Sequence, residues 1–126
     1  MNKILIVDDE KNILLVLKKA LQSTGYQVST ASDGVEALDK ASEISPDLIL
    51  LDIVLPKLNG FMVYEALKEE PKTEDIPVIF ISAKSEEEDI RKAEELGAKD
   101  YLVKPIKQKE LLDTVQSVLK EGENNG

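Results

Sequence analysis

The chain has 126 residues, the size of one ordinary domain, and its 16 basic and 25 acidic residues give a formal charge of −9. It contains no cysteine and no histidine, which excludes disulfide scaffolds, zinc–thiolate sites, cysteine nucleophiles, Ser–His–Asp triads and histidine proton relays. The negative charge argues against direct binding to nucleic acid, so any chemistry must rest on carboxylates, hydroxyls, lysines and an oxygen-binding metal.

No targeting or membrane segment is recognisable in the sequence. The chain begins with MNKILIVDDE, whose short apolar run ends in three acids, unlike a signal peptide. Its longest apolar runs are about four to five residues, far below the ~20 that span a bilayer. We therefore expect a cytoplasmic protein that does not associate with membranes.

Five short apolar segments predict strands, at residues 4–7, 28–31, 48–51, 78–81 and 101–103. The first, third and fourth read ILIV, LILL and VIFI, which are apolar at every position. Such runs are typical of strands buried on both faces of a parallel sheet. The second segment alternates apolar and polar residues and predicts a half-exposed edge strand, and the short last segment predicts the opposite edge.

Apolar residues at helical spacing predict a helix after each strand. The five stripes are Ile13, Leu14, Leu17, Ala20 and Leu21; Val35, Leu38, Ala41 and Ile44; Val63, Ala66 and Leu67; Ile90, Ala93 and Leu96; and Leu111, Leu112, Val115, Val118 and Leu119. Gly25 and Gly97 are stop signals after the first and fourth stripes. Asp33 opens the second helix, and the fourth begins with a capping-box pattern at Ser85 and Glu88.

Strands that alternate with helices five times predict a doubly wound α/β fold, in which a parallel sheet carries helices on both faces. The sequence shows no repeat and no internal linker. The polar tail at residues 121–126, EGENNG, is expected to fray beyond the last helix. It is either the end of the protein or the stub of a linker to a second domain.

Polar side chains follow four of the predicted strands. Asp8 and Asp9 follow the first strand, Asp52 the third, Ser82 the fourth and Lys104 the fifth. Because the carboxyl ends of parallel strands share one edge of the sheet, where ligands bind, we expect these side chains to converge. Three neighbouring carboxylates repel one another, and Lys104 supplies only one positive charge. The pattern therefore predicts a site for a hard dication such as Mg²⁺.

A site of this composition is suited to a phosphoryl group. The metal and Lys104 would balance the phosphoryl oxygens, and Ser82 would donate a hydrogen bond to them. One carboxylate would act as the nucleophile and form an acyl phosphate. Asp52 is the better candidate because it stands alone after the most buried strand, whereas the adjacent Asp8 and Asp9 are more suitable as a metal cradle.

Each of these residues also has an ordinary structural explanation. Asp8, Asp9 and Glu10 are suitable caps for the first helix, Asp52 fits a turn, and Lys104 fits a solvated surface. The functional interpretation is favoured because complementary charges meet at the same end of a sheet that was inferred without them.

Four segments in this order and spacing resemble the receiver domain of two-component response regulators, the CheY-like superfamily. They are VDDE at 7–10, LLDIVLPKLNG at 50–60, ISAK at 81–84 and GAKDYLVKP at 97–105. The resemblance covers residues 2–120 and implies a flavodoxin-like sheet of five strands in the order 2-1-3-4-5 with five helices. It implies a phosphorylation-dependent switch rather than a turnover enzyme, one that catalyses only its own phosphoryl transfer and slow autodephosphorylation.

The resemblance also implies the ligands of the metal. Asp52 would be the phosphoacceptor, and the phosphoryl group would come from the phosphohistidine of a sensor histidine kinase or a histidine phosphotransfer protein. Asp9, Asp52 and the backbone carbonyl of Val54 would bind Mg²⁺, and Asp8 would contribute mainly through water. Mn²⁺ is expected to substitute for Mg²⁺.

Further roles implied by the resemblance concern the switch. Lys104 would pair with the phosphoryl group, and its bond to Pro105 would be cis. Ser82 would be the switch hydroxyl, and Tyr101 the aromatic that is coupled to it. The surface formed by the fourth helix, last strand and last helix would then change its partner: a downstream protein, an effector domain outside this chain, or a second copy in a phosphorylation-linked homodimer.

Two positions beside the site tune the lifetime of the phosphorylated state in such domains. They lie two residues after the phosphoacceptor and two after the switch hydroxyl, and here they are Val54 and Lys84. Valine neither orients nor activates water, and a lysine is able to shield the phosphoryl group. The hypothesis is a comparatively long-lived phosphorylated form.

Two other classes of function compete with this interpretation. A phosphatase of the haloacid-dehalogenase type also uses an aspartate at a strand end, but it carries a second acid two residues later, where this chain has Val54. A scaffold without chemistry would use the fold for protein contacts alone. A small phosphodonor with Mg²⁺ separates the three classes, because a receiver gains one phosphate, a phosphatase turns over and a scaffold does neither.

Overall fold

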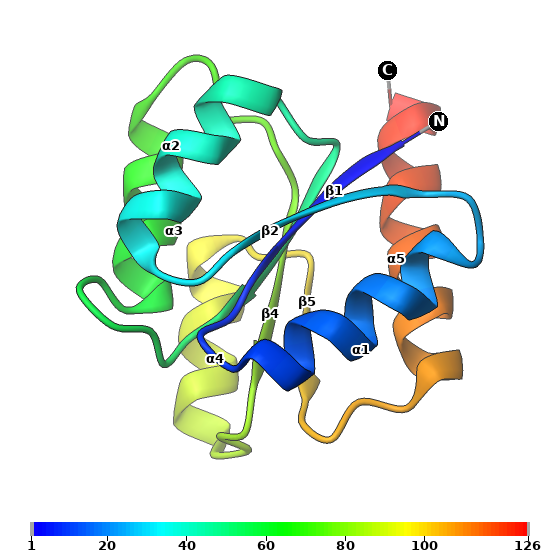
Figure 1. Cartoon of the computed structure of the whole chain (residues 1–126). Coiled ribbons are helices and arrows are strands. Elements are labelled where there is room, and N and C mark those ends of the chain that lie inside the picture. The colour runs from blue at the N-terminus through cyan, green and yellow to red at the C-terminus, as the bar shows by residue number, and fades with distance from the viewer. Residues whose placement is uncertain (1, 126) are drawn as a thin grey trace.

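The computed structural model describes residues 2–125, in which five parallel strands alternate with five helices (Figure 1). The strands are β1 (Lys3–Val7), β2 (Gln27–Ala31), β3 (Leu48–Asp52), β4 (Val78–Ser82) and β5 (Asp100–Val103). The helices are α1 (Lys11–Gln22), α2 (Gly34–Ile44), α3 (Gly60–Glu69), α4 (Glu87–Leu96) and α5 (Gln108–Asn125). The sheet order β2-β1-β3-β4-β5 confirms the predicted fold class.

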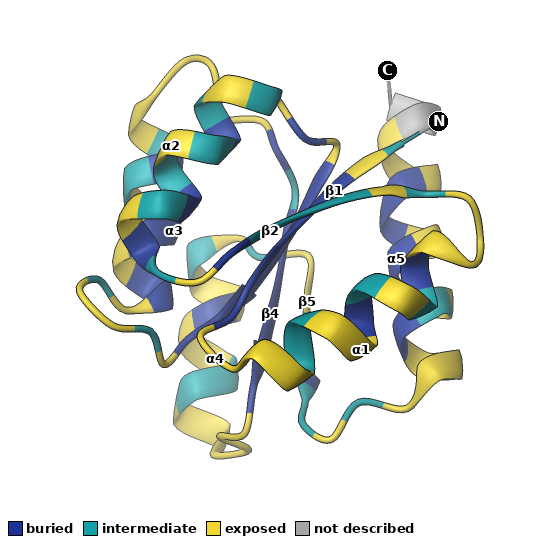
Figure 2. Ribbon diagram, viewed as in Figure 1, coloured by how far each residue is buried: buried dark blue, intermediate teal, exposed yellow. Residues whose placement is uncertain are grey.

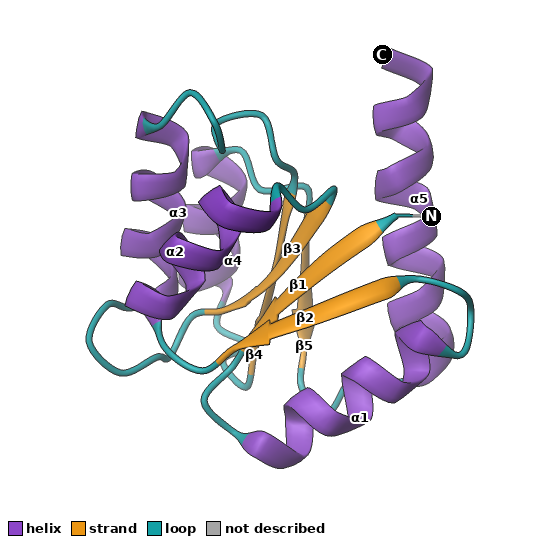
Figure 3. Cartoon of the chain, turned by 45° about the horizontal axis from the view of Figure 1, so that its top comes forward, coloured by secondary structure: helices purple, strands orange, loops and turns teal. Residues whose placement is uncertain are grey.

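The sheet separates two apolar cores. Helices α2, α3 and α4 cover one face of the sheet, and α1 and α5 cover the other (Figure 3). Alternate strand residues point to opposite faces, so Leu5 and Val7 pack with the first group of helices and Ile4 and Ile6 with the second. The inner strands are covered by helices on both faces, so their apolar runs are buried, as Figure 2 shows for most of β1 and for β4. This explains the unbroken apolar runs in the sequence.

The two outer strands are more exposed than the inner three. Only Ala31 is buried in β2, and only Leu102 in β5, whereas every residue of β3 and β4 is buried. The predicted edge strands are therefore confirmed. The inner strands β3 and β4 also extend one residue beyond their apolar runs, so Asp52 and Ser82 are the last residues of their strands.

The predicted apolar stripe of α2 is wrong at its first position. Val35 is exposed. The buried residues of α2 are Gly34, Ala37 and Ala41, and the partly buried Leu38 packs against the same core. A Cβ atom on Gly34 would lie 2.7 Å from the Cβ atom of Leu58. The start of α2 therefore approaches the loop before α3 so closely that small residues take the inward positions.

The predicted capping box of α4 is also wrong. The helix begins at Glu87, and its N-cap residue Glu86 makes no side-chain hydrogen bond to the first turn. With Ser85 one position too early, Glu88 is the second helical residue rather than the third, so the reciprocal bonds of a capping box are not formed. The acidic first turn, with Glu87, Glu88 and Asp89, still complements the helix dipole.

Helix α5 continues through residues 121–125 rather than fraying at the polar tail. It has 18 residues and is the longest helix. Charged and polar residues interrupt its apolar positions throughout. None of the helices in the described part of the chain is long and apolar enough to cross a membrane.

The start of α3 is held against the end of β3. Asn59 caps the helix by accepting a hydrogen bond from the backbone N–H of Met62, at 3.0 Å. The backbone N–H of Gly60 donates to the carbonyl of Ile53, at 2.7 Å. A Cβ atom on Gly60 would lie 2.3 Å from the backbone oxygen of Asp52, so this approach requires glycine.

Replacing Gly60 by alanine is expected to lower the free energy of unfolding by about 2 kcal/mol or more, because the main chain around Asp52 must shift. The gain in helix propensity, about 1 kcal/mol at most, does not offset this cost. Gly122→Ala is the matched control, because Gly122 lies in α5 with open space at its Cβ position, and it should stabilise slightly. Urea unfolding of both variants measures the difference, and equal stability would contradict the close approach.

Candidate functional site

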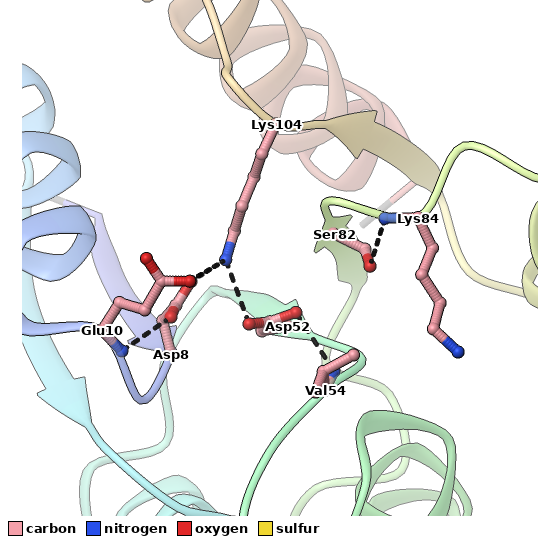
Figure 4. A network of polar contacts seen from close by, with 7 residues as sticks. All are labelled: Asp8, Glu10, Asp52, Val54, Ser82, Lys84 and Lys104. Carbon is pink, nitrogen blue, oxygen red and sulfur yellow. Dashed lines mark hydrogen bonds and ion pairs between the residues drawn. The ribbon is translucent and has the colours of Figure 1, made fainter.

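A largely covered lysine side chain joins the ends of three strands. Asp8 follows β1, Asp52 ends β3 and Lys104 follows β5, all at the same edge of the sheet. The Lys104 Nζ lies 2.7 Å from Asp8 Oδ2 and 3.1 Å from Asp52 Oδ2 (Figure 4). Only 11% of the lysine side chain is exposed. The structure thus brings together three of the side chains that the sequence placed at this edge.

The Asp8 side chain is completely buried, and its two carboxylate oxygens differ in their hydrogen bonds. Its Oδ1 accepts a hydrogen bond from the backbone N–H of Glu10, at 2.9 Å. Its Oδ2 lies close to Lys104 but accepts no well-directed hydrogen bond from any described residue. A buried carboxylate oxygen of this kind is costly unless a further positive charge or donor reaches it, so it fits the presence of a cation.

Asp52 is also buried, and its two oxygens have different partners. Oδ1 accepts a hydrogen bond from the Val54 N–H at 3.2 Å, and Oδ2 accepts one from Lys104. Burial, followed by repulsion from Asp8, raises the pKa of Asp52 despite these bonds. Burial alone would lower the pKa of Lys104, but its close contacts with the Asp8 and Asp52 carboxylates raise it. One ammonium therefore does not fully compensate the two carboxylates.

Two exposed acids complete the pocket. The exposed acids are Asp9 and Glu10. Each of them has a carboxylate oxygen within 4.8 Å of the other's and of an oxygen of Asp8. Glu10 Oε1 also lies 3.8 Å from Lys104 Nζ. An all-oxygen donor set with excess negative charge fits Mg²⁺ or another hard dication. The sequence placed Glu10 only as a helix cap, yet its side chain makes no cap hydrogen bond; its position directly after the paired aspartates was the available signal.

Ser82 and Tyr101 meet through the backbone of Lys84. The buried Ser82 Oγ accepts a hydrogen bond from the Lys84 N–H at 3.1 Å, and the Tyr101 hydroxyl donates to the Lys84 carbonyl at 2.7 Å. Burial raises the pKa of the Tyr101 hydroxyl. The Lys104 N–H donates to the Ser82 carbonyl at 2.8 Å, but among the described residues no hydrogen bond joins the Ser82 hydroxyl to Asp52 or to the Lys104 ammonium. Sequence patterns did not indicate that the main chain of residue 84 links these two side chains.

The other residues predicted for the site are Val54, Lys84 and Pro105. The Val54 side chain is exposed beside Asp52. The Lys84 side chain points away from Asp52 in Figure 4, so shielding of a group on Asp52 would require it to rotate. The Lys104–Pro105 peptide bond, which the resemblance implies to be cis, is cis.

Comparison with known proteins gives relatives over nearly the whole chain. The chain matches the response regulator receiver domain family over residues 4–116. It is 45% identical over 121 residues to the alkaline phosphatase synthesis transcriptional regulatory protein PhoP of Bacillus subtilis (strain 168), covering 96% of this chain and 50% of that protein. It is 43% identical over 118 residues to the transcriptional regulatory protein PrrA of Mycobacterium leprae, covering 94% and 50%. The chain spans about half the length of these curated relatives.

Solved structures of similar length share the fold. The chemotaxis response regulator CheY4 of Vibrio cholerae has a TM-score of 0.88 and 35% identity, with 94% of this chain and 98% of that chain covered. A CheY-like receiver domain protein of Methanospirillum hungatei JF-1 has a TM-score of 0.91 and 31% identity, with 100% and 99% covered. With the family match, the sheet order and the resemblance of the four motifs in agreement, the chain belongs to the receiver domain family of two-component response regulators.

Proposed function

We propose that this receiver domain accepts a phosphoryl group on Asp52 from the phosphohistidine of a histidine kinase or phosphotransfer protein, in a reaction that depends on a divalent cation. The observation that supports this most strongly is the buried contact of Lys104 with both Asp8 and Asp52 at the end of three strands. Phosphorylation-dependent signalling is the role of the family, and the pocket has the charges that such a reaction needs.

The transfer is a displacement at phosphorus. A carboxylate oxygen of Asp52 forms a bond to phosphorus while the bond from phosphorus to the donor nitrogen breaks, and the imidazole leaves with that electron pair. Lys104 is already paired with Asp52 Oδ2 and is placed to neutralise the incoming phosphoryl oxygens. Autodephosphorylation reverses the modification: water attacks phosphorus, the bond from phosphorus to the Asp52 oxygen breaks, and the carboxylate leaves with that electron pair as inorganic phosphate is released.

The divalent cation has a matching set of donors. Asp9, Asp52 and the Val54 carbonyl would hold Mg²⁺, or Mn²⁺ in its place, with Asp8 contributing mainly through water. When bound, the ion supplies positive charge that offsets repulsion between the donor's phosphoryl group and these carboxylates. The unsatisfied Asp8 Oδ2 and the raised pKa of Asp52 support a second positive charge in this pocket.

The hydrogen bonds of residue 84 would link phosphorylation of Asp52 to a change at the protein surface. A phosphoryl group on Asp52 would compete for the Ser82 hydroxyl, which the Lys84 N–H now holds, and Tyr101 is bonded to the other side of the same residue. The consequence is a shift in the populations of the α4–β5–α5 surface, to which Tyr101 belongs. Its partner would be an effector domain outside this chain, a separate target protein or a second copy. The length of the transcriptional regulators it matches supports the first of these.

Asp52→Asn should abolish phosphoryl incorporation from a small phosphodonor in the presence of Mg²⁺, because the amide is not a nucleophile. Asp39→Asn is the matched control, because Asp39 is exposed on α2, away from the pocket. Intact mass spectrometry should find one acid-stable, base-labile phosphoryl group on the parent and the control. Full labelling of Asp52→Asn would overturn the assignment. Rapid release of phosphate by the parent without accumulation of the phosphorylated protein would indicate a phosphatase.

Mg²⁺ should stabilise the folded protein, and EDTA should remove the effect together with phosphorylation. An ion that binds only the folded state at one hundred times its dissociation constant adds about 2.7 kcal/mol. Asp9→Asn should lose most of this rise in Tm, whereas Asp39→Asn should keep it. Thermal unfolding with and without Mg²⁺ checks this, and an equal response from Asp9→Asn would remove Asp9 from the ligand set.

Val54→Asn should shorten the lifetime of the phosphorylated form several-fold, since an amide beside Asp52 is able to orient water where valine is not. Val35→Asn, at an exposed valine of α2, is the control and should leave the lifetime unchanged. Loss of the phosphorylated species with time, followed by intact mass after the donor is removed, gives the rate. A rate for Val54→Asn equal to or slower than that of the parent would contradict the hypothesis.

A further inference from the structure

Glu10 lies beside Asp8 and Lys104, and its side chain makes no hydrogen bond that stabilises α1. It is the N-cap residue of α1, but its side chain makes no cap hydrogen bond. The side chain is 63% exposed, and its one ion pair with a described residue is the 3.8 Å contact with Lys104 Nζ. The fold therefore does not depend on this carboxylate, and the carboxylate is free to change its orientation.

The backbone nevertheless keeps Glu10 beside the acidic pair. Its N–H donates to Asp8 Oδ1 at 2.9 Å, which fixes the main chain of residue 10 against a fully buried side chain. As a result one carboxylate oxygen of Glu10 comes within 4.8 Å of those of Asp8 and Asp9. Although the chain has 25 acidic residues, this is the one grouping of three so close together in the described part of the chain.

The distances around Lys104 rank the three carboxylates that share it. Asp8 is the nearest at 2.7 Å, Asp52 follows at 3.1 Å, and Glu10 is the farthest at 3.8 Å. Glu10 is also the most exposed of the three, so solvent screens its attraction to the ammonium most strongly. It therefore loses least when it turns from Lys104 toward another cation.

We propose that Glu10 is a fourth acidic residue of the divalent-ion site and that it sets the affinity of the pocket for the ion. In the ion-free protein its carboxylate faces Lys104. With the ion present it turns toward the ion, which leaves the ammonium to Asp8, Asp52 and the phosphoryl group. The inference rests on the proposed function, since it assumes that the pocket binds a dication.

Glu10→Gln tests this by removing the charge and keeping the shape. Isothermal titration calorimetry with Mg²⁺ at fixed ionic strength should show an affinity about five- to tenfold below that of the parent, the size expected for one exposed charge near a dication. Half-maximal phosphorylation by a small phosphodonor should need a correspondingly higher Mg²⁺ concentration. Asp39→Asn removes one charge from α2 and should bind Mg²⁺ as the parent does.

The Tm in EDTA separates this role from a structural one, because Glu10→Gln should unfold at the temperature of the parent when no ion is bound. An Mg²⁺ affinity equal to that of the parent would overturn the inference, as would an equal loss of affinity in Asp39→Asn. In both cases the parent still binds Mg²⁺, so the proposed function would stand. A parent that binds no divalent ion would remove the proposed function and this inference together.

Discussion

The ion pairs of Lys104 with Asp8 and Asp52 determine how the functional edge of this protein is built. Two buried carboxylates repel each other and lose hydration, so they require a cation inside the fold. The sheet order places β1 next to β3, which brings the two aspartates together, but β4 separates β5 from β3. The long lysine stem spans that separation, and its compact ammonium fits between two oxygens at 2.7 and 3.1 Å.

Most of the fold and the outline of the pocket were predictable because they depend on patterns along the chain. Apolar runs identified the inner strands, and polar residues directly after them identified Asp8, Asp52 and Lys104. The predictions were wrong where contacts between segments that are distant in the sequence determine which residues are buried. Val35 is exposed because Gly34 packs against Leu58, a contact that periodicity does not reveal. Glu10 was overlooked as a pocket residue because glutamate before a helix has an ordinary explanation.

The main chain of residue 84 carries contacts that no sequence motif could have indicated. Its N–H holds Ser82 and its carbonyl receives the hydroxyl of Tyr101, and both bonds are available to any residue other than proline at this position. The Lys84 side chain is separate from these bonds and points away from Asp52. One position thus combines a backbone contact that is independent of residue type with a side chain that is free to vary.

The division of the interior by the sheet has a further consequence for divergence within the family. Side chains of α1 and α5 pack in one layer and those of α2, α3 and α4 in another, with the strands between them. Residues in different layers share few direct neighbours, and the effects of substitutions without shared partners tend to add. One layer is therefore able to accumulate replacements without matching changes in the other.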